Sequence, residues 1–319
     1  MSRILVTGGC GFVGVNLIPA LLERSHQVRV LDNLSTGRRE DVETFHVDLQ
    51  LGDIRNQADA ARAMQGVDEV VHLAAHTRVM DSIEDPRTNF EVNALGTFNL
   101  LLAARERGVK KFVMASTGGA ILGEKEPPVH EEMVARPLSP YGAGKLAGEG
   151  YLSAFHGSYG LATVALRFSN VYGPYSYLKA SAVAAFYKRI LQGQPLIVYG
   201  DGNQTRDFLF TEDLVAAVLL ALEKAPGGEV FQIASGQETS VNKLISTMRE
   251  VVSEAGFEVK HEPARRGEIL RNYSDISKAR KVLDYSPRTA LRSGLKETWR
   301  WFQDNKEKVL NLARQKSAS

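Results

Sequence analysis

Short apolar runs alternate with longer amphipathic segments through the first half of the chain. Six runs rich in Val, Ile, Leu and Phe predict β-strands, at residues 3–7, 27–32, 45–48, 69–73, 111–115 and 162–168. Between them, helices are predicted to begin near Phe12, Asn56, Pro86 and Pro140. Strands that alternate with helices indicate βαβ units, whose right-handed crossovers predict an α/β fold with a doubly wound parallel sheet.

The alternation breaks after residue 168. A loop rich in Gly, Pro and Tyr, at 173–177, leads into a predicted helix at about 180–192. A strand and helix at 207–224 and a strand at 229–233 could return to the sheet, whereas later residues predict separate helices and a short strand. We therefore expect two units. They are a Rossmann domain of residues 1–168 plus about 207–234, and a smaller, discontinuous α/β lobe of about 169–206 plus 235–319, with a loose tail at 315–319.

Composition narrows the class of protein. With 319 residues, 44% hydrophobic and 24% charged, the chain has the balance of a globular protein. Its formal charge of +2 gives no sign of a nucleic-acid or anionic-membrane partner. Cys10 is the only cysteine, which excludes an intrachain disulfide and a Cys-rich zinc site and fits a reducing compartment. The N-terminus has no secretory pattern and no apolar stretch reaches the roughly 18 residues of a membrane span. We therefore expect a cytoplasmic protein without a metal, nucleic-acid or membrane site.

The strongest local signal is a glycine-rich turn between the first predicted strand and the first predicted helix. Gly8, Gly11 and Gly14 are spaced as GxxGxxG, and Phe12 and Val13 open the helix. Glycine permits positive φ and a close approach of the backbone to a pyrophosphate, which the helix N-terminus then stabilises. An isolated glycine triple would indicate no more than a turn. Here the triple has the strand–turn–helix context that dinucleotide binding requires.

An acidic residue at the second strand end extends this prediction. Asp32 lies 18 residues beyond Gly14, where an acid would bond the adenosine ribose, although alone it would indicate a turn residue before Asn33. Its carboxylate would repel the extra phosphate of NADP, so the predicted cofactor is NAD. Arg38 and Arg39 could either neutralise such a phosphate or be exposed loop charges.

Two later strand ends complete the predicted cofactor site. Asp53 and Ile54 could hold the edge and the face of the adenine. Ala74 and Ala75, which follow Leu73 at the end of the fourth strand, are small enough for a cofactor to lie against the sheet edge. Each is an ordinary strand terminus by itself, and becomes a candidate because ligands bind at the carboxyl ends of strands in such sheets.

A YxxxK pair, Tyr141 and Lys145, lies on one face of a predicted helix. A tyrosine titrates near pH ~10 and becomes a base at neutral pH only where a cation stabilises its phenolate, which Lys145 is placed to do. Beside an oxidised nicotinamide, Tyr141 could take the proton of a substrate hydroxyl as hydride leaves carbon. The alternative is an ordinary amphipathic pair. Ser116 and Thr117 favour catalysis, because they follow the preceding strand and either could bond the same hydroxyl.

Taken together, the motifs resemble the extended short-chain dehydrogenase/reductase superfamily, in its NAD-dependent nucleotide-sugar epimerase/dehydratase branch. The resemblance covers nearly the whole chain, to at least Trp301, and its motifs occur in order. They are TGGCGFVG (7–14), LDN (31–33), GDIR (52–55), HLAAH (72–76), Asn93 in EVNALGT, Ser116 with Thr117, YGAGK (141–145), LRFSNVYGP (166–174), RDFLFTED (206–213) and RRGE (265–268).

For the cofactor, the resemblance implies a tightly held NAD that is reduced and reoxidised within one turnover. Asn33 and Asn93 would be among its contacts, and Phe168 would pack at the nicotinamide. Tyr141 would be the base, and Lys145 its electrostatic partner and a cofactor ligand.

For the substrate, the resemblance implies a nucleotide-diphosphate sugar. Thr117 would touch the sugar, and Asn170, Arg206 and Arg265 would grip the diphosphate, for which the guanidinium fork is independently suited. Lys179 would either join them or be a surface lysine. Members of the family commonly dimerise through helices of the Rossmann lobe, which implies a homodimer.

The chain departs from the family pattern after the serine/threonine pair. Ile121-Leu122-Gly123 replaces the usual VYG, and the preceding Gly118-Gly119-Ala120 makes the segment one residue longer than in the dehydratases, which leaves the choice between Ser116 and Thr117 open. The family position that screens the sugar's 2-substituent falls on Asn272, which is smaller than tyrosine and would admit an N-acetyl group.

We therefore predict an NAD-dependent epimerase of a nucleotide-diphosphate sugar, above all a 4-epimerase of UDP-glucose/galactose or of the N-acetyl forms. One alternative is a 4,6-dehydratase or decarboxylase of the same fold; the dehydratases carry Asp-Glu where this chain has Gly118 and Gly119. The other is a non-catalytic NAD-binding module, which would not need Tyr141 and Lys145.

Overall fold

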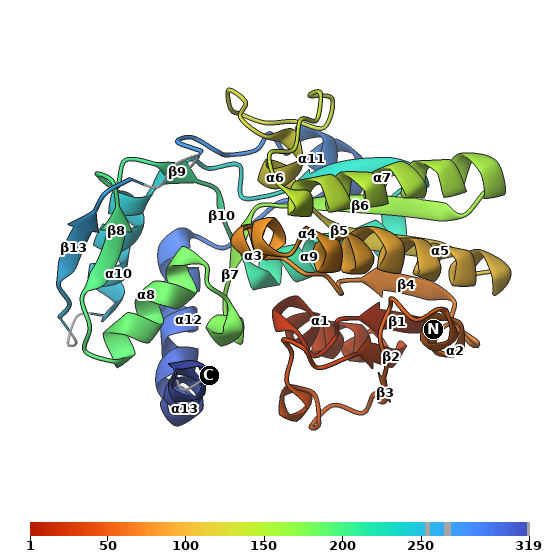
Figure 1. The fold of residues 1–319 in the computed structure, drawn as a ribbon, viewed down its shortest axis with the longest axis horizontal. Coiled ribbons are helices and arrows are strands. Elements are labelled where there is room, and N and C mark those ends of the chain that lie inside the picture. The colour runs from red at the N-terminus through yellow and green to blue at the C-terminus, as the bar shows by residue number, and fades with distance from the viewer. Residues whose placement is uncertain (253–255, 265–268, 318–319) are drawn as a thin grey trace.

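The central sheet is parallel throughout. A computed structural model describes residues 1–252, 256–264 and 269–317 of the chain. Seven strands lie in the order β11-β6-β5-β4-β1-β2-β3 (Figure 1). They are β1 (Arg3–Thr7), β2 (Gln27–Asp32), β3 (Asp48–Leu51), β4 (Glu69–His72), β5 (Lys111–Thr117), β6 (Ala162–Phe168) and β11 (Glu229–Ile233). The strand order reverses between β1 and β4, so the predicted doubly wound fold is confirmed, and all carboxyl ends share one edge.

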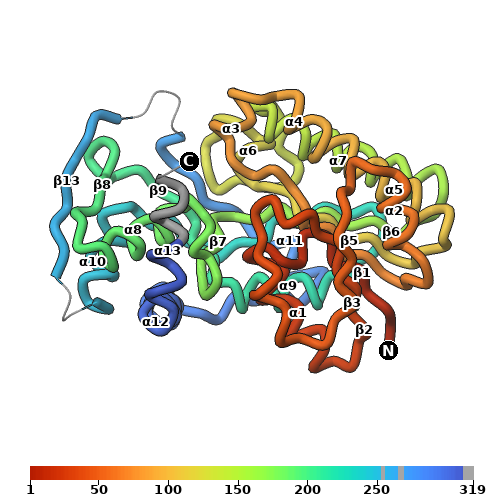
Figure 2. Tube along the Cα trace, turned by 60° about the horizontal axis from the view of Figure 1, so that its bottom comes forward, coloured from red at the N-terminus to blue at the C-terminus, as the bar shows by residue number. Residues whose placement is uncertain are grey.

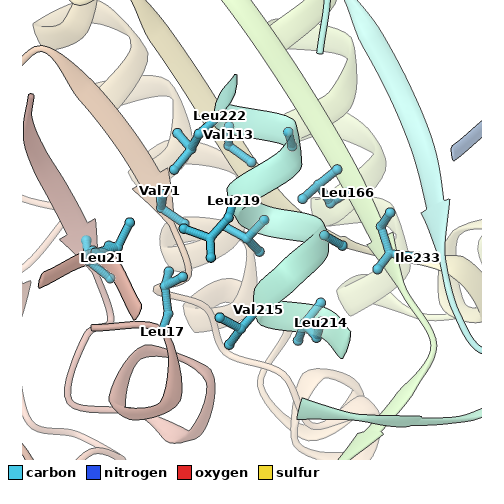
Figure 3. Close-up of a cluster of buried hydrophobic side chains, with 14 of the residues drawn as sticks. Leu17, Leu21, Val71, Val113, Leu166, Leu214, Val215, Leu219, Leu222 and Ile233 are labelled. Carbon is cyan, nitrogen blue, oxygen red and sulfur yellow. The ribbon is translucent and has the colours of Figure 1, made fainter. Parts of the chain in front are cut away.

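Helices cover both faces of this sheet. Because side chains alternate along a strand, Ile4 and Val6 face one core and Leu5 faces the other. The first face packs against α1 (Phe12–Glu23) and α9 (Thr211–Lys224), with α11 (Ser277–Leu283) beside α9. Figure 3 shows Leu214, Leu219 and Leu222 of α9 among the buried side chains between this helix and the strands. The second face lies under α2 (Gln57–Ala63), α5 (Thr97–Glu106) and α7 (Pro140–Tyr159).

Shorter helices surround the carboxyl edge of the sheet. They are α3 (Val79–Glu84), α4 (Pro86–Phe90), a π-helical turn (Glu91–Gly96) and α6 (Gly118–Leu122). The π-helical turn joins α4 to α5 without a break, and such turns frequently mark functional sites.

A second lobe lies beside the Rossmann lobe (Figures 1 and 2). Its core is separate and is centred on aromatic and aliphatic side chains such as Tyr187, Leu244 and Phe302. Its helices are α8 (Ala182–Leu191), α10 (Val241–Val252), α12 (Leu291–Asp304) and α13 (Lys306–Ser317). Its strands pair two by two: β7 (Asn170–Tyr172) with β10 (Phe208–Phe210), β9 (Thr205–Arg206) with β12 (Thr239–Ser240), and β8 (Leu196–Tyr199) with β13 (Val259–Glu262).

Two predicted strands differ from the structure. The strand predicted at 45–48 is wrong, because Phe45 and Val47 pack against the core from a turn and the strand begins only at Asp48. The strand near 207 does not rejoin the main sheet but pairs with β7, whereas β11 does return. Side chains of β10 enter both cores, Leu209 the first and Phe208 and Phe210 the second.

None of the helices in the described ranges is long and apolar enough to cross a lipid bilayer. Within the same ranges, no three His, Cys, Asp or Glu side chains gather where they could hold a metal ion.

Candidate active site

The glycine-rich turn forms a cradle at the carboxyl edge of the sheet. Gly8 has φ +69°, and a Cβ there would lie 2.6 Å from the backbone nitrogen of Ala74. A Cβ on Gly14 would collide with the backbone of Gly9. The first turn of α1 can therefore pack against the loop only if residue 14 is a glycine. No side chain caps α1 at Gly11, so the N–H groups of its first turn are open to an anion. These features fit the pyrophosphate of a dinucleotide.

The structure places Asp32 beside this cradle. Its carboxylate is buried and accepts hydrogen bonds from the backbone N–H groups of Cys10 (3.0 Å) and Leu34 (2.8 Å). Burial outweighs these bonds and raises the pKa of Asp32. A carboxylate held between two loops and still able to accept bonds fits a ribose diol. Arg39 is exposed and pairs with Glu43, so the structure supports its assignment as a loop charge.

Asp53 and Ile54 are more constrained than the sequence suggested. Arg55 bonds both carboxylate oxygens of Asp53, at 3.0 and 2.8 Å, and Asn33 donates a further bond at 2.9 Å. The Arg55 guanidinium lowers the pKa of Asp53 to about 2. Ile54 is buried, and a Cβ on Gly96 would lie 2.6 Å from it. Arg55 stands in the GDIR motif, but its pairing with Asp53 was not predicted.

A buried histidine fixes the loop of Leu73, Ala74 and Ala75. The Thr97 hydroxyl donates to the carbonyl of Asn93 (2.7 Å), so it must accept from Nε2–H of His72 at 2.9 Å. Nδ1 of His72 therefore accepts from the Thr7 hydroxyl at 2.7 Å. Burial lowers the pKa of His72 well below its usual value, so the ring is neutral.

Asn93 also holds this loop rather than pointing into open space. Its carboxamide accepts from the backbone N–H of His76 (3.0 Å) and donates to the carbonyl of the same residue (2.9 Å) and to Asn89 (3.0 Å). The π-helical turn supplies the extra residue that aims Asn93 at the loop. Asn93 thus supports the predicted cofactor site through the backbone of His76.

Three consecutive residues at the end of β5 bond to three residues along one face of α7. The carbonyl of Ala115 accepts from Nζ of Lys145 (2.9 Å). The hydroxyl of Ser116 donates to Oε1 of Glu149 (2.7 Å). The hydroxyl of Thr117 is hydrogen-bonded to Tyr141. The hydroxyl of Ser116 is therefore engaged by Glu149, and Thr117 is the hydroxyl residue beside Tyr141.

Burial acts on both members of the YxxxK pair. It raises the pKa of Tyr141 to about 12, an effect that the hydrogen bond with Thr117 partly offsets. It lowers the pKa of Lys145 to about 8, against the attraction of Glu149. Lys145 is thus still a cation at neutral pH, with N–H groups beyond the one given to Ala115 for a further partner.

Glu149 extends the face of Tyr141 and Lys145 by one turn and was missed by the sequence analysis. Its carboxylate takes a bidentate pair from Arg167, at 2.9 and 2.8 Å, and both side chains are buried. Arg167 lies directly opposite Ser116 across the β5–β6 ladder, and Phe168 lies opposite Thr117. Phe168 therefore stands next to Thr117, where the predicted nicotinamide site would be.

The segment after Thr117 folds as α6 and carries no titratable side chain. A Cβ on Gly118 would lie 2.7 Å from Gln232, and one on Gly119 would lie 2.7 Å from Asn272. Ile121 and Leu122 are fully buried. Asn272 therefore lies against the segment that follows Thr117.

The predicted diphosphate residues come from the second lobe. Asn170 is exposed at the start of β7. The Arg206 guanidinium donates to the carbonyls of Thr205 (2.7 Å) and Ile269 (2.8 Å), which fixes its plane. Lys179 lies with its ammonium 5.0 Å from the ring centre of Phe12. Arg265 lies outside the described residues.

A buried carboxylate in the RDFLFTED motif, to which the sequence had suggested no role, ties this region together. Asp207 accepts bonds from Ser235 (backbone 2.8 Å, hydroxyl 2.7 Å), Gly236 (2.9 Å), Ser274 (3.4 Å) and Ser169 (3.4 Å). Its neighbour in sequence is Arg206, so Asp207 anchors the strand that carries it.

Asp32→Ala should reduce the preference for NAD over NADP by roughly tenfold or more, because it removes both a charge-assisted bond to the ribose and the repulsion of a phosphate. The two dissociation constants should be measured by calorimetry. Asp48→Ala is the matched control, since Asp48 opens β3 at the opposite edge and pairs with Arg29. An unchanged NAD/NADP ratio in Asp32→Ala would show that the ribose contact is wrong.

Comparison with known proteins agrees with this geometry. Residues 4–234 match the model of the NAD dependent epimerase/dehydratase family. A UDP-glucose 4-epimerase of Mycolicibacterium smegmatis is 36% identical over 96% of this chain and all of its own length. A Thermotoga maritima UDP-glucose 4-epimerase solved with UDP-glucose superposes with a TM-score of 0.91 at 36% identity, covering 95% of this chain and 99% of its own. One from Thermus thermophilus, solved with NAD, has a TM-score of 0.88 at 38% identity, covering 94% and 99%.

Similarity extends to enzymes with another reaction. A dTDP-glucose 4,6-dehydratase of Streptomyces niveus is 35% identical over 95% of this chain and 94% of its own length. Overall similarity therefore does not separate the two reactions, and the residues of the site must do so.

Proposed function

The chain belongs to the NAD-dependent epimerase/dehydratase family, and from its site residues we propose that it interconverts the C4 epimers of a UDP-hexose through a transient 4-keto sugar. It is an enzyme with NAD as cofactor, as the motifs indicated. The observation that supports 4-epimerisation best is the set of bonds between the end of β5 and α7. These bonds hold Tyr141 and Thr117 beside α6, which carries no acidic side chain.

In this proposal Tyr141 holds and moves the proton of the 4-hydroxyl. Bound NAD supplies the acceptor for the C4 hydride and its return to the other face of the sugar. Tyr141 takes the 4-hydroxyl proton in the first half of the reaction and gives it back in the second. Thr117 orients that hydroxyl, and the positive charge of Lys145 favours the phenolate of Tyr141, against the burial that raises the pKa of Tyr141.

We assign the cofactor contacts to the residues around the glycine cradle. Those at the glycine-rich turn and later strand ends are Gly8, Gly11, Phe12, Val13, Gly14, Asp32, Asn33, Asp53, Ile54, Leu73, Ala74, Ala75 and Phe168, with Asn93 acting through the backbone of His76. Asn170 and Arg206 would hold the diphosphate of the sugar nucleotide, together with Arg265. A diphosphate held by the second lobe would keep the 4-keto sugar in the site while its ring turns over.

The residues after Thr117 favour epimerisation over dehydration. Loss of water across C5 and C6 needs an acid for the leaving hydroxyl and a base for the C5 proton. Gly118 and Gly119 offer neither, and Glu124 and Glu126 are exposed. Asn272, next to Gly119, leaves room for a 2-N-acetyl group because it is shorter than tyrosine.

The purified enzyme, incubated with UDP-, GDP- and dTDP-hexoses, should give C4 epimers of UDP-sugars and no accumulating 4-keto-6-deoxy sugar. Product NMR, with mass spectrometry for the loss of one water, distinguishes the two reactions. A 4-keto-6-deoxy sugar as the main product would replace the epimerase proposal by a dehydratase with an acid from another part of the site.

We further propose a homodimer located in the cytoplasm. Large apolar side chains are exposed on α3, α4, the π-helical turn and α7: Met80, Ile83, Phe90, Leu95 and Tyr151. α7 contacts α3, α4 and the π-helical turn, and a second copy of the chain would cover the apolar side chains that these elements expose. The cytoplasmic location rests on the single, buried cysteine and on the use of NAD.

A further inference from the structure

A segment of the second lobe, residues 174–179, lies against the cofactor side of the Rossmann lobe; we call it the clasp. At its start, the side chain of Asn16 in α1 donates to the carbonyl of Pro174 (3.0 Å). In its middle, the hydroxyl of Tyr177 donates to Asp41 (2.7 Å), in the loop that follows Asp32. Its last residue, Lys179, reaches the ring of Phe12. The clasp thus bridges the lobes at three points.

The second lobe holds the clasp from behind. Tyr175 and Tyr177 pack against Trp301 of α12, with ring centres 4.8 and 5.5 Å apart. Lys308 of α13 also bonds the buried carboxylate of Asp41. Packing against the second lobe therefore holds the part of the clasp that precedes Lys179.

Lys179 is a partly buried cation without an acid to balance it. No carboxylate in the described parts of the chain forms an ion pair with its ammonium group. Burial accordingly lowers the pKa of Lys179 to about 8, with no opposing charge. The face of Phe12 offers partial compensation, since a cation is attracted to an aromatic ring at this distance. An uncompensated buried charge is unfavourable, so this arrangement calls for an anionic ligand.

Lys179 lies over a residue of the turn that receives the cofactor's phosphates in this fold. Phe12 is the first residue of α1, and the open N–H groups of that turn receive the pyrophosphate of a dinucleotide in this fold. We propose that Lys179 binds the pyrophosphate of NAD, so that the clasp of the second lobe holds the cofactor in place. The proposal rests on the use of NAD and not on the identity of the sugar reaction. It moves Lys179 from the sugar-nucleotide diphosphate, where the resemblance had placed it, to the cofactor.

The clasp would also explain how the cofactor is kept through turnover. A helix N-terminus alone contacts the pyrophosphate from one side and leaves its other side open. A cation from the second lobe would contact the pyrophosphate from that other side. NAD could then leave only when the hydrogen bonds that join the clasp to Asn16 and to Asp41 break.

The test compares Lys179→Met with Lys179→Arg in the NAD-loaded enzyme. The rate at which bound NAD exchanges with isotopically labelled NAD should rise roughly 10- to 100-fold in Lys179→Met, as expected for one lost charge-assisted bond, and should be largely restored in Lys179→Arg. ADP-ribose, which keeps the pyrophosphate but lacks nicotinamide, should lose affinity by the same factor. Lys110→Met is the matched control, because Lys110 is exposed and pairs with Asp68 before β4, at the opposite sheet edge.

Affinity for UDP, measured by calorimetry on the NAD-loaded variants, decides between the two phosphates. The proposal expects unchanged UDP affinity in Lys179→Met. Weakened UDP binding with normal NAD exchange would assign Lys179 to the substrate and overturn the proposal. Unchanged NAD exchange and unchanged UDP affinity would overturn it equally. Circular dichroism of both variants excludes unfolding as the cause of a faster exchange.

Discussion

Tyr141→Phe should lower turnover by roughly 10²- to 10⁴-fold while leaving NAD bound, since it removes the one oxygen that can carry the proton of the sugar hydroxyl. The substitution removes little volume, and the bonds that hold α7 to β5 at Lys145 and Glu149 remain. Turnover should be measured with the sugar nucleotide that the product survey identifies, and bound NAD by its release on denaturation.

Tyr172→Phe is the matched control for this prediction. Tyr172 is a buried tyrosine whose hydroxyl makes a 3.4 Å bond to the carbonyl of Leu291, in the second lobe. Its loss should change turnover little. If Tyr141→Phe also kept near-normal turnover, Tyr141 would not be the base.

The pH dependence gives a further readout of the same pair. Lys145→Met removes a positive charge, which stabilises the phenolate of Tyr141, so the pKa of Tyr141 should rise. A base is active when deprotonated, and the acid limb of the turnover profile should therefore move to higher pH. A profile that stayed in place would separate Lys145 from the base.

The cofactor cradle was predictable because its determinants are close in sequence. Gly8, Gly11 and Gly14 lie within one turn, and Asp32 ends the next strand, so spacing alone brings them together. The packing of Gly8 on Ala74 joins segments that lie further apart in the sequence.

The choice between Ser116 and Thr117 could not be made from spacing. Both hydroxyls follow β5, and what separates them is Glu149, which engages Ser116 from 33 residues further along the chain. Asp207 and Arg55 escaped notice for a related reason. The side chain of Asp207 bonds backbone groups, and that of Arg55 bonds the carboxylate of Asp53. A sequence motif gives residue types but does not give the partners of their side chains.

The predicted strand at 45–48 failed because apolar residues were taken as a strand. Phe45 and Val47 do enter the core, but from a turn after the short helix Arg39–Asp41, and the polar Asp48 opens the actual strand. A run of apolar residues indicates burial and does not by itself indicate a strand. An edge strand such as β3 can form with few buried side chains.

The buried ion pair beneath the site carries the largest expected effect on stability. Glu149→Leu would leave the Arg167 guanidinium buried without a counter-charge and the Ser116 hydroxyl without its acceptor. Breaking one side of a buried pair costs roughly 3–5 kcal/mol, so we expect a fall of that size in the free energy of unfolding in urea. Turnover should fall as well, since Ser116 stands between the residues that hold Lys145 and Tyr141.

A double variant tests whether the loss comes from the uncompensated charge or from packing. Glu149→Leu combined with Arg167→Met removes both charges and keeps apolar volume, so it should be more stable than Glu149→Leu alone by roughly 1–3 kcal/mol. Lys110→Met, which breaks an exposed pair, should change the free energy of unfolding little and sets the baseline. If the double variant lost as much as the sum of its two single variants, the pair would matter only through shape, and Glu149 would not fix the end of β5 by charge.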